Sequence, residues 1–290
     1  MILVTGATGH FGKAAIDFLI AKGIPSGEIA ALVRDEAKTG DLREKGVVVK
    51  IGDYLQYDTL VNAFKGVDKL LLVSSSDVEN RSLQHTNAVN AAKEAGVKYI
   101  LYTSFERKND TESSPIAFIA KAHLDTEELI KNSGIPYTIF RNNLYMDFIP
   151  VFIGEKVLES GIYWPAGDTK GAFATRSDMA EAAAVVLAGD GHEGKEYVIS
   201  NIENVSFHSV AEVLSQAAGK PISYTSPGAD EYKSTLTQAG VPAVYIDMFV
   251  AFAEAIKQGE FEINNSDLQK LLGRKPTTLA EYLKDVYASN

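Results

Sequence analysis

The sequence contains no cysteine in its 290 residues, which excludes disulfide bonds, thiolate catalysis and zinc sites built from thiolates. It also lacks any apolar run as long as a membrane-spanning helix. Basic residues are in deficit, because 28 lysines and arginines face 38 aspartates and glutamates, giving a net charge of -10. Since an acidic surface repels nucleic acid and anionic membranes, we expect neither as a partner.

A glycine-rich turn lies near the start of the chain. It follows a predicted apolar strand over 1–5, which argues against a cleaved signal and for a cytoplasmic protein. Gly6 permits a tight turn, Gly9 lets the backbone approach a pyrophosphate, and Gly12 lets the following apolar helix pack closely on the strand. Strand, turn and helix together predict a dinucleotide site, with a ligand-free glycine turn as the alternative. Predicted to bind the cofactor here are Gly6, Thr8, Gly9, His10, Phe11 and Gly12.

The choice of cofactor depends on the residues after the second predicted strand, 29–33. Arg34 follows this strand directly, where a guanidinium would bind a ribose 2′-phosphate, and Lys38 lies one helical turn on. Asp35 would instead favour a free 2′-hydroxyl, unless it caps the short helix that follows. We therefore predict NADP(H), with NAD(H) as the second choice; the alternative for Arg34 is a solvated charge.

Further cofactor contacts are predicted where other strands end. Asp53 follows the strand over 47–51, where its carboxylate either accepts from the adenine amino group or caps the helix over 56–65. Polar side chains after the strands over 69–73 and 97–103 border the crevice of such a sheet. Those we assign to the cofactor are Ser74, Ser75, Thr103 and Ser104.

Strands and helices alternate six times up to residue 147, which predicts an α/β fold with a Rossmann-type, doubly wound parallel sheet. We assign residues 1–147, with a returning strand near 195–200, to an NADP-binding domain. Residues 148–290 are predicted to form mostly a smaller, largely helical cap, integrated with the first domain, that closes the substrate end of the crevice.

The chain resembles the NmrA-like group of atypical short-chain dehydrogenase/reductases, and within it the bacterial NAD(P)H:quinone oxidoreductases and triphenylmethane-dye reductases. The resemblance covers nearly the whole chain, and its most specific part lies after the sixth predicted strand, 137–140. It implies NADP(H) binding, with Arg141 at the cofactor, and an open C-terminal substrate pocket. The matching stretches are Gly6-Ala7-Thr8-Gly9 with Gly12, Val33-Arg34, Gly52-Asp53-Tyr54, Ala95-Gly96-Val97-Lys98, His123 with Thr126-Glu127, Gly134-Ile135-Pro136-Tyr137-Thr138 with Arg141-Asn142, and Thr175-Arg176-Ser177-Asp178-Met179-Ala180.

One departure concerns the Tyr-x-x-x-Lys pair of short-chain reductases, in which the tyrosine is the acid and the lysine lowers its pKa. Lys121 lies on the helix predicted over 116–132, but Ala117 stands where the tyrosine would be. This argues against an alcohol dehydrogenase or a sugar epimerase, since both must handle a proton at a carbinol oxygen. Lys121 either holds the nicotinamide ribose hydroxyls or is an exposed lysine beside Asp125.

Reduction of a quinone-like or other conjugated small-molecule acceptor needs no side-chain acid. Positioning of the acceptor over the nicotinamide suffices, and solvent can supply the proton. We predict that Phe105, Asn143 and Tyr145 contact this acceptor, and that Lys121, Asn143 and Tyr145 are the catalytic residues. The five histidines show no metal-binding spacing, so no metal is expected.

The predicted function is an NAD(P)H-dependent oxidoreductase of a quinone-like acceptor, acting as a monomer or homodimer. A non-catalytic NADP(H) redox sensor of the NmrA type is the first alternative, because the missing tyrosine fits it equally well. A nucleotide-sugar epimerase or reductase is the second, and the missing tyrosine argues against it.

Overall fold

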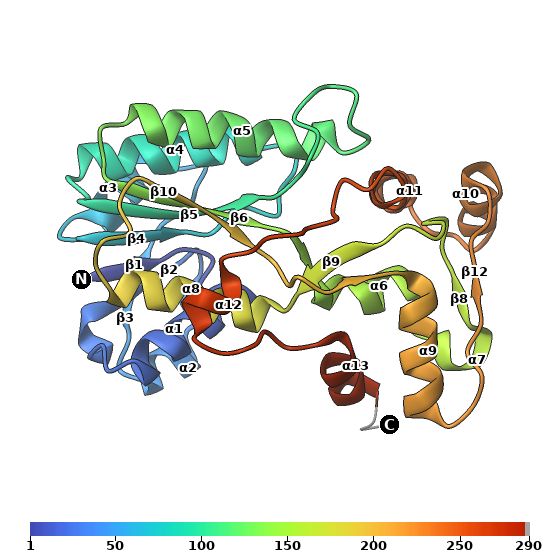
Figure 1. The fold of residues 1–290 in the computed structure, drawn as a ribbon. Helices are drawn as coiled ribbons and strands as arrows, with labels where there is room; N and C mark the ends of the chain where they lie inside the picture. The colour runs from blue at the N-terminus through green and yellow to red at the C-terminus, as the bar shows by residue number, and fades with distance from the viewer. Residues whose placement is uncertain (288–290) are drawn as a thin grey trace.

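The computed structural model describes residues 1–287, apart from the side chain of Lys38. Seven parallel strands form the main sheet in the order β10-β6-β5-β4-β1-β2-β3 (Figure 1). The winding reverses between β1 and β4, so the predicted doubly wound, Rossmann-type fold is confirmed. The strands are β1 (Ile2–Val4), β2 (Ile29–Val33), β3 (Val48–Ile51), β4 (Lys69–Leu72), β5 (Tyr99–Phe105), β6 (Tyr137–Asn142) and β10 (Lys195–Ile199).

Helices cover both faces of this sheet (Figure 1). Successive strand residues point to opposite faces, so Leu3 packs in the core beneath one helix layer and Val4 in the core beneath the other. One layer consists of α1 (His10–Ala21), α2 (Gly40–Glu44), α8 (Arg176–Ala188) and α12 (Leu268–Leu272). The other consists of α3 (Tyr57–Phe64), α4 (Arg81–Glu94) and α5 (Ala117–Asn132).

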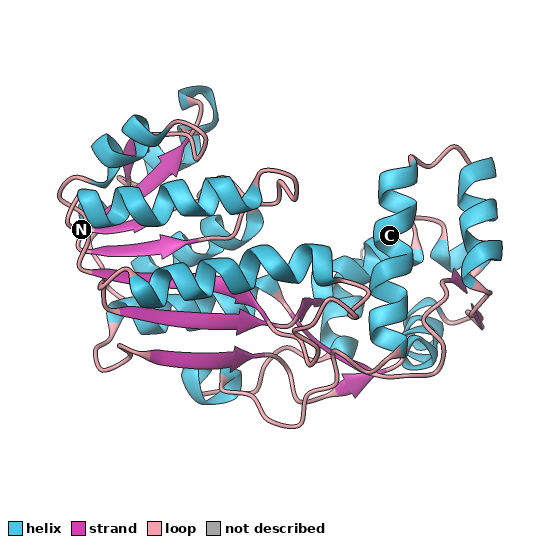
Figure 2. Ribbon diagram, turned by 90° about the horizontal axis from the view of Figure 1, so that it is seen from above, coloured by secondary structure: helices cyan, strands magenta, loops and turns pink. Residues whose placement is uncertain are grey.

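The C-terminal part has its own core, centred on Trp164, whose ring stacks on Phe152 at 4.5 Å. Figure 2 shows its helices grouped beyond one end of the large sheet. The helices are α6 (Ile149–Ile153), α7 (Val157–Ser160), α9 (Phe207–Ala218), α10 (Ala229–Gln238), α11 (Ala243–Lys257) and α13 (Leu279–Tyr287). Two small sheets join β7 (Leu144–Tyr145), β9 (Gly171–Ala174) and β11 (Asn204–Val205), and β8 (Ile162–Tyr163) and β12 (Tyr224–Thr225).

Three short 3-10 helices complete the fold: η1 (Ser26–Glu28), η2 (Glu36–Lys38) and η3 (Met146–Phe148). Within residues 1–287, no helix is both long and apolar enough to traverse a lipid bilayer.

The structure refines the C-terminal part of the sequence interpretation. The helical stretch after residue 148 is broken at Gly154, whose φ of 80° lies in the left-handed region. α8 begins after Thr175, whose side chain accepts from the Asp178 amide at 3.1 Å. α8 also packs directly on α1, so more of the second half returns to the Rossmann part than the single strand β10.

Candidate functional site

The turn between β1 and α1 is shaped by its three glycines. Gly6 adopts a φ of 58°, a conformation that other residues rarely take. A Cβ atom on Gly12 would lie 2.4 Å from the Gly6 oxygen, so only glycine lets α1 approach the strand this closely. Gly9 is the N-cap of α1 and caps it with no side chain, which leaves the first amides of the helix free for a phosphate.

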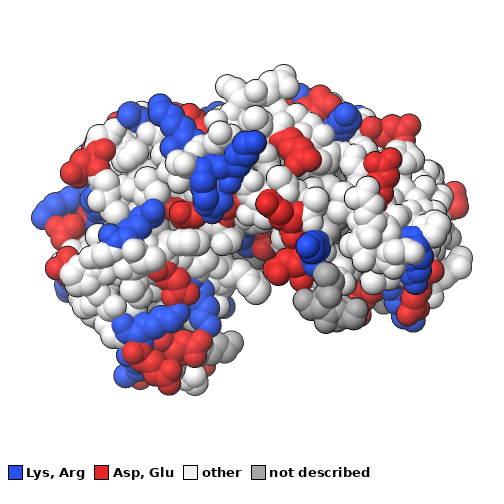
Figure 3. Space-filling view, turned by 60° about the horizontal axis from the view of Figure 1, so that its bottom comes forward, with Lys and Arg blue, Asp and Glu red and all other residues white. Residues whose placement is uncertain are grey.

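The other residues of the glycine-rich turn that are predicted to bind the cofactor differ in their exposure to solvent. Thr8 and His10 are exposed at the turn, whereas Phe11 is buried in the core beneath α1. Only the backbone amide of Phe11 is therefore available to a ligand. Figure 3 shows a hollow between the part that carries α1 and α2 and the C-terminal part of the molecule.

The end of β2 distinguishes the roles of two charged neighbours. The Asp35 side chain caps η2 by accepting from the Ala37 amide at 2.9 Å, as one of the two sequence interpretations had it. Arg34 is exposed and has no hydrogen-bond or ion-pair partner among the described residues. Its guanidinium is thus free to bind an anion, while the side chain of Lys38 lies outside the described part of the structure.

Asp53 lies just beyond β3 and is partly buried. Its side chain accepts from the Leu55 amide at 2.9 Å, ahead of α3, whose N-cap Gln56 makes no side-chain capping bond. Asp53 is therefore not the cap of this helix, and its second carboxylate oxygen makes no hydrogen bond within the described residues. An adenine amino group is compatible with that position.

The segment Val73–Ser75, which follows β4, is held by side chains from several elements, and we call it the β4 end. Its amides donate to Thr5 (2.8 Å), Thr103 (2.9 Å) and His85 (3.0 Å). The Ser75 carbonyl accepts from Arg81 Nε at 2.7 Å. The backbone that borders the crevice at the β1–β4 reversal is therefore fixed in place before any ligand binds.

The predicted hydroxyl ligands near this segment are already engaged. Thr103 is buried and accepts from the Ser74 amide, and the buried Ser104 hydroxyl donates to Glu127. The Ser75 hydroxyl accepts from the Asp77 amide at 3.1 Å. Ser74 is thus the half-buried residue of this group whose side chain makes no hydrogen bond within the described residues, and Thr103 supports the β4 end.

Two histidines lie buried between α4, α5 and β5. His85 accepts from the Ser75 amide at Nε2, so its proton is on Nδ1, which lies 2.9 Å from Thr126 Oγ1. His123 Nδ1 bonds to the Tyr102 hydroxyl at 2.8 Å. Burial, reinforced by the nearby positive charge of Arg81, lowers the pKa of His85 to about 3 and that of His123 well below its ordinary value. Both rings are therefore neutral.

Aromatic rings line the C-terminal side of the strand ends. Tyr145 and Phe105 are both half-buried, as expected for walls of a substrate pocket. The ring of Phe105 lies 5.8 Å from that of His123. A continuous row of rings connects Tyr145 to Phe105 through Phe148, Phe152, Phe252 and Phe261.

Tyr145 is held by polar groups at both its ring and its hydroxyl. Arg176 lies over the ring, with Cζ 4.5 Å from the centroid. The hydroxyl accepts from Asn142 Nδ2 at 3.4 Å, which leaves its own proton free to be donated. Burial raises the pKa of Tyr145, and the Asn142 hydrogen bond and the charges of Arg176 and Arg81 oppose this rise. The phenol is protonated at neutral pH.

Asn143, predicted to contact the acceptor, is buried and hydrogen-bonded to neighbouring elements. It is 2% exposed, and its Nδ2 donates to Ser200 Oγ and the Phe261 carbonyl, each at 3.1 Å. Its Oδ1 accepts from the Leu144 amide at 2.8 Å. With its amide fully bonded, Asn143 is a structural tie, whereas the neighbouring Asn142 keeps a buried Oδ1 without a partner.

Lys121 lies on the outer face of α5. Its side chain is 74% exposed and pairs with Asp125 at 2.7 Å, as the simpler sequence interpretation had it. The inner face of α5 carries Ile119 and His123 at the i, i+4 positions instead. Since α5 contains no tyrosine in any register, the conclusion that a Tyr-x-x-x-Lys pair is missing holds.

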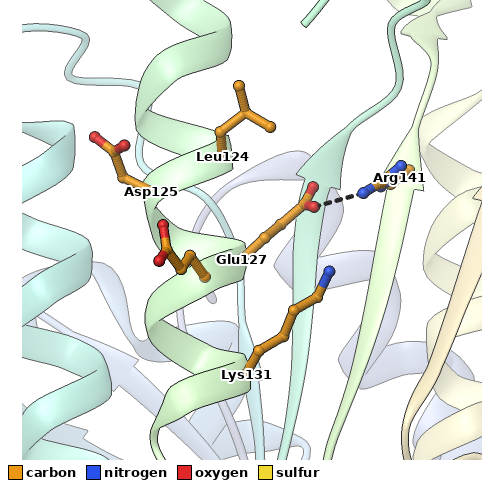
Figure 4. A pocket seen from close by; sticks show the side chains of 6 residues that line it. Leu124, Asp125, Glu127, Lys131 and Arg141 are labelled. Carbon is orange, nitrogen blue, oxygen red and sulfur yellow. Dashed lines mark hydrogen bonds and ion pairs between the residues drawn. The ribbon is translucent and has the colours of Figure 1, made fainter.

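Arg141 lies near the carboxyl end of β6, beside α5. Its Nη2 pairs with Glu127 at 2.8 Å and with Glu196 at 3.1 Å, and Figure 4 shows Glu127 of α5 pointing toward it. These residues border a surface pocket of about 330 Å³ between α5 and β6. Because two carboxylates pair with its guanidinium, Arg141 ties α5 to the sheet, and its predicted contact with the cofactor stays a prediction.

Three side chains near the crevice escape prediction from the sequence: Arg81, Asn142 and Phe148. Arg81 is 7% exposed, and its Nη1 atom has no partner. It is the first residue of a helix of largely polar sequence, so no local pattern marks it as buried.

In residues 1–287, no group of three histidine, aspartate or glutamate side chains is placed to hold a metal ion.

Comparisons with known proteins agree with this geometry. The model of the NmrA-like family matches residues 1–283. Quinone oxidoreductase 2 of Escherichia coli (strain K12) is 38% identical over 291 residues, covering 100% of both chains.

Two solved structures are similar over nearly their full length. The NADPH-dependent quinone oxidoreductase of E. coli complexed with NADPH has a TM-score of 0.92 at 36% identity, covering 99% of this chain and 100% of that one. The Citrobacter sp. triphenylmethane reductase complexed with NADP(H) has a TM-score of 0.90 at 39% identity, covering 98% of this chain and 99% of that one.

Proposed function

Because the chain belongs to the NmrA-like family, we propose that it is an NADPH-dependent reductase that passes hydride to quinone-like, conjugated acceptors. The observation that carries this proposal is the pairing of two free anion-binding groups at the crevice. These are the uncapped N-terminus of α1 behind Gly9 and the unpartnered guanidinium of Arg34.

The residues present fit NADP(H) along the whole crevice. The turn from Gly6 to Gly12 suits the pyrophosphate, Arg34 suits the 2′-phosphate, and Asp53 suits the adenine amino group. At the far end, the β4 end would border the nicotinamide, and Asn142 Oδ1 is a buried acceptor without a partner. NAD(H) is the second choice, because Asp35 is used as the cap of η2.

When bound, NADPH supplies the hydride. The chain positions the acceptor and provides an aromatic wall that excludes water from it. Phe105, Tyr145 and Phe148 would flank a flat acceptor over the nicotinamide. α5 holds no tyrosine to act as an acid, so solvent provides the product's proton in this proposal.

The C-terminal part completes the proposed site. We assign the cap role to residues 148–290 outside α8, β10 and α12, since these three elements pack with the Rossmann part. The proposal further includes a cytoplasmic location and a monomer or homodimer.

The test is steady-state oxidation of NADPH, followed by its absorbance, with a panel of benzoquinones and naphthoquinones. Turnover with several quinones, lost in Gly9→Val, would support the proposal. Tight NADPH binding by calorimetry without turnover on any quinone, azo or triphenylmethane acceptor would replace it with the redox-sensor function. Interconversion of a nucleotide sugar without net NADPH loss would replace it with the epimerase function.

A further inference from the structure

Arg81 is a buried cation without a counter-ion. Its side chain is 7% exposed, and no carboxylate forms an ion pair with it among the described residues. Arg107, the other buried arginine of the described chain, pairs with Asp110 and Glu127. A buried charge without a partner is costly, so its retention calls for an explanation.

The groups around Arg81 do not neutralise it. Nε donates to the Ser75 carbonyl, and Nη1 has no partner at all. The carboxylate that interacts electrostatically with it is that of Asp77, which is already bonded to Asn80 and to Gln84 Nε2. The positive charge of the Arg81 guanidinium therefore acts on the other groups around it.

Those neighbours place the charge at the acceptor end of the crevice. The bond to Ser75 fixes Arg81 behind the β4 end, which would border the nicotinamide. Arg81 also interacts electrostatically with Tyr145, the ring that would form a wall of the acceptor pocket. The charge is thus near the atoms on which electrons would arrive.

We propose that Arg81 selects acceptors by charge, favouring neutral quinones that become anionic on reduction and disfavouring cationic dyes. The inference rests on the proposed reductase function and deepens it by naming the acceptor class. It also distinguishes between the two kinds of acceptor for which the similar solved enzymes are named, quinones and triphenylmethane dyes.

The balance of charge gives the sign of the effect. A hydride brings two electrons and one proton, so a neutral quinone that accepts it becomes a hydroquinone monoanion, while NADPH becomes NADP⁺. A proton from water then neutralises the monoanion. A cationic triarylmethyl dye becomes neutral instead, so a fixed positive charge stabilises no product and repels the substrate.

The experiment compares kcat/KM for a neutral naphthoquinone and for crystal violet in wild type and Arg81→Gln. We expect the naphthoquinone value to fall about 10- to 100-fold, as for loss of a partly buried charge contact, and the crystal violet value to hold or rise. Arg81→Lys should retain most of the wild-type preference. Lys93→Gln, at the exposed far end of α4, removes an equal charge and should change neither value.

A second variant guards against loss of the Ser75 bond in Arg81→Gln. Gln84→Glu keeps Arg81 and its bond, and adds a carboxylate one helical turn away on the same buried face. As in Arg81→Gln, kcat/KM should fall for the naphthoquinone and should hold or rise for crystal violet. Equal losses on both acceptors in Arg81→Gln and Gln84→Glu would overturn the proposal, because a purely structural role cannot distinguish acceptor charge.

Equilibrium binding separates this proposal from the proposed function. Binding of an anthraquinone sulfonate, measured by fluorescence titration without NADPH, should weaken about tenfold in Arg81→Gln, while crystal violet binding should not weaken. Unchanged binding of the sulfonate would overturn the charge proposal. If wild type binds the probes as expected but reduces no acceptor, the reductase function fails and the charge selection stands.

Discussion

The carbonyl oxygen of Gly6 lies 2.4 Å from the point that a Cβ on Gly12 would occupy, whereas a Cβ on Gly9 would lie 3.3 Å from the same oxygen. The two glycines therefore serve different ends. Gly12 sets the approach of α1 to β1, and Gly9 keeps the cradle open.

We expect Gly9→Val to remain folded and to lose NADPH binding, because its side chain would occupy the pyrophosphate space. Gly12→Ala should instead lower the free energy of unfolding by about 1–3 kcal/mol through overpacking. Chemical denaturation and calorimetric titration of both variants measure the difference. Full NADPH affinity in a folded Gly9→Val protein would contradict the phosphate-cradle assignment.

Arg34→Ala should weaken NADPH binding by roughly ten- to hundredfold, the effect of losing one charge-assisted contact of about 1.5–3 kcal/mol. NADH affinity should not change, because NADH lacks the 2′-phosphate. Asp35→Ala is the matched control, since it removes only the cap of η2. Equal wild-type affinities for NADPH and NADH, by calorimetry, would contradict the choice of cofactor.

Tyr145→Phe should reduce quinones nearly as well as wild type, because the ring and its contact with Arg176 remain. Tyr145→Ala should raise the apparent KM or lower kcat by misplacing the acceptor. Steady-state kinetics across pH distinguish a wall from an acid. A rate deficit in Tyr145→Phe that grows as pH rises, where solvent protons become scarce, would show that this phenol supplies the proton.

Asn143→Ala should destabilise the protein by about 2–3 kcal/mol, since it leaves buried partners at Ser200, Phe261 and Leu144 unsatisfied. Below its unfolding temperature, kcat/KM should match wild type. Asn109→Ala, in an exposed loop, is the control for amide removal. A large kinetic loss with unchanged stability would restore Asn143 to the acceptor site.

Acid should destabilise the protein through His85. Its pKa is about 3 in the folded state, against an ordinary value near 6.5, so between these pH values the unfolded chain binds the extra proton. Stability is thus greatest above about pH 6.5 and is lost as the pH falls toward 3. His85→Gln should show a shallower decline in denaturation experiments, and an unchanged slope would contradict the assignment.

Signals that are local in the sequence predicted the backbone around the candidate site well. The glycine spacing, the strand ends and Arg34 all depend on the residues immediately around them, and the topology brings them to one crevice. The cap at Asp35 is of the same kind.

Side chains on helices were harder to place, because burial there depends on helix rotation and on neighbouring elements. Lys121 had two open interpretations, a ribose-binding or an exposed lysine, and the packing of Ile119 and His123 on the inner face decides its direction. Arg81 and His85 look like surface residues of a polar helix, although both are buried. Asn142 and Asn143 are adjacent, and contacts with Ser200 and Phe261, both distant in the sequence, determine which one is fully bonded.

The position of β10 at the edge of the sheet also constrains how the chain folds during synthesis. β10 pairs with β6, and α8 covers the same sheet, but both are translated only after β7, α6, α7, β8 and β9. Until then, β6 presents an unpaired edge and the core beside α1 lacks its cover. A fragment ending near residue 147 would therefore aggregate, and the nucleotide-binding half cannot be transplanted alone as a module.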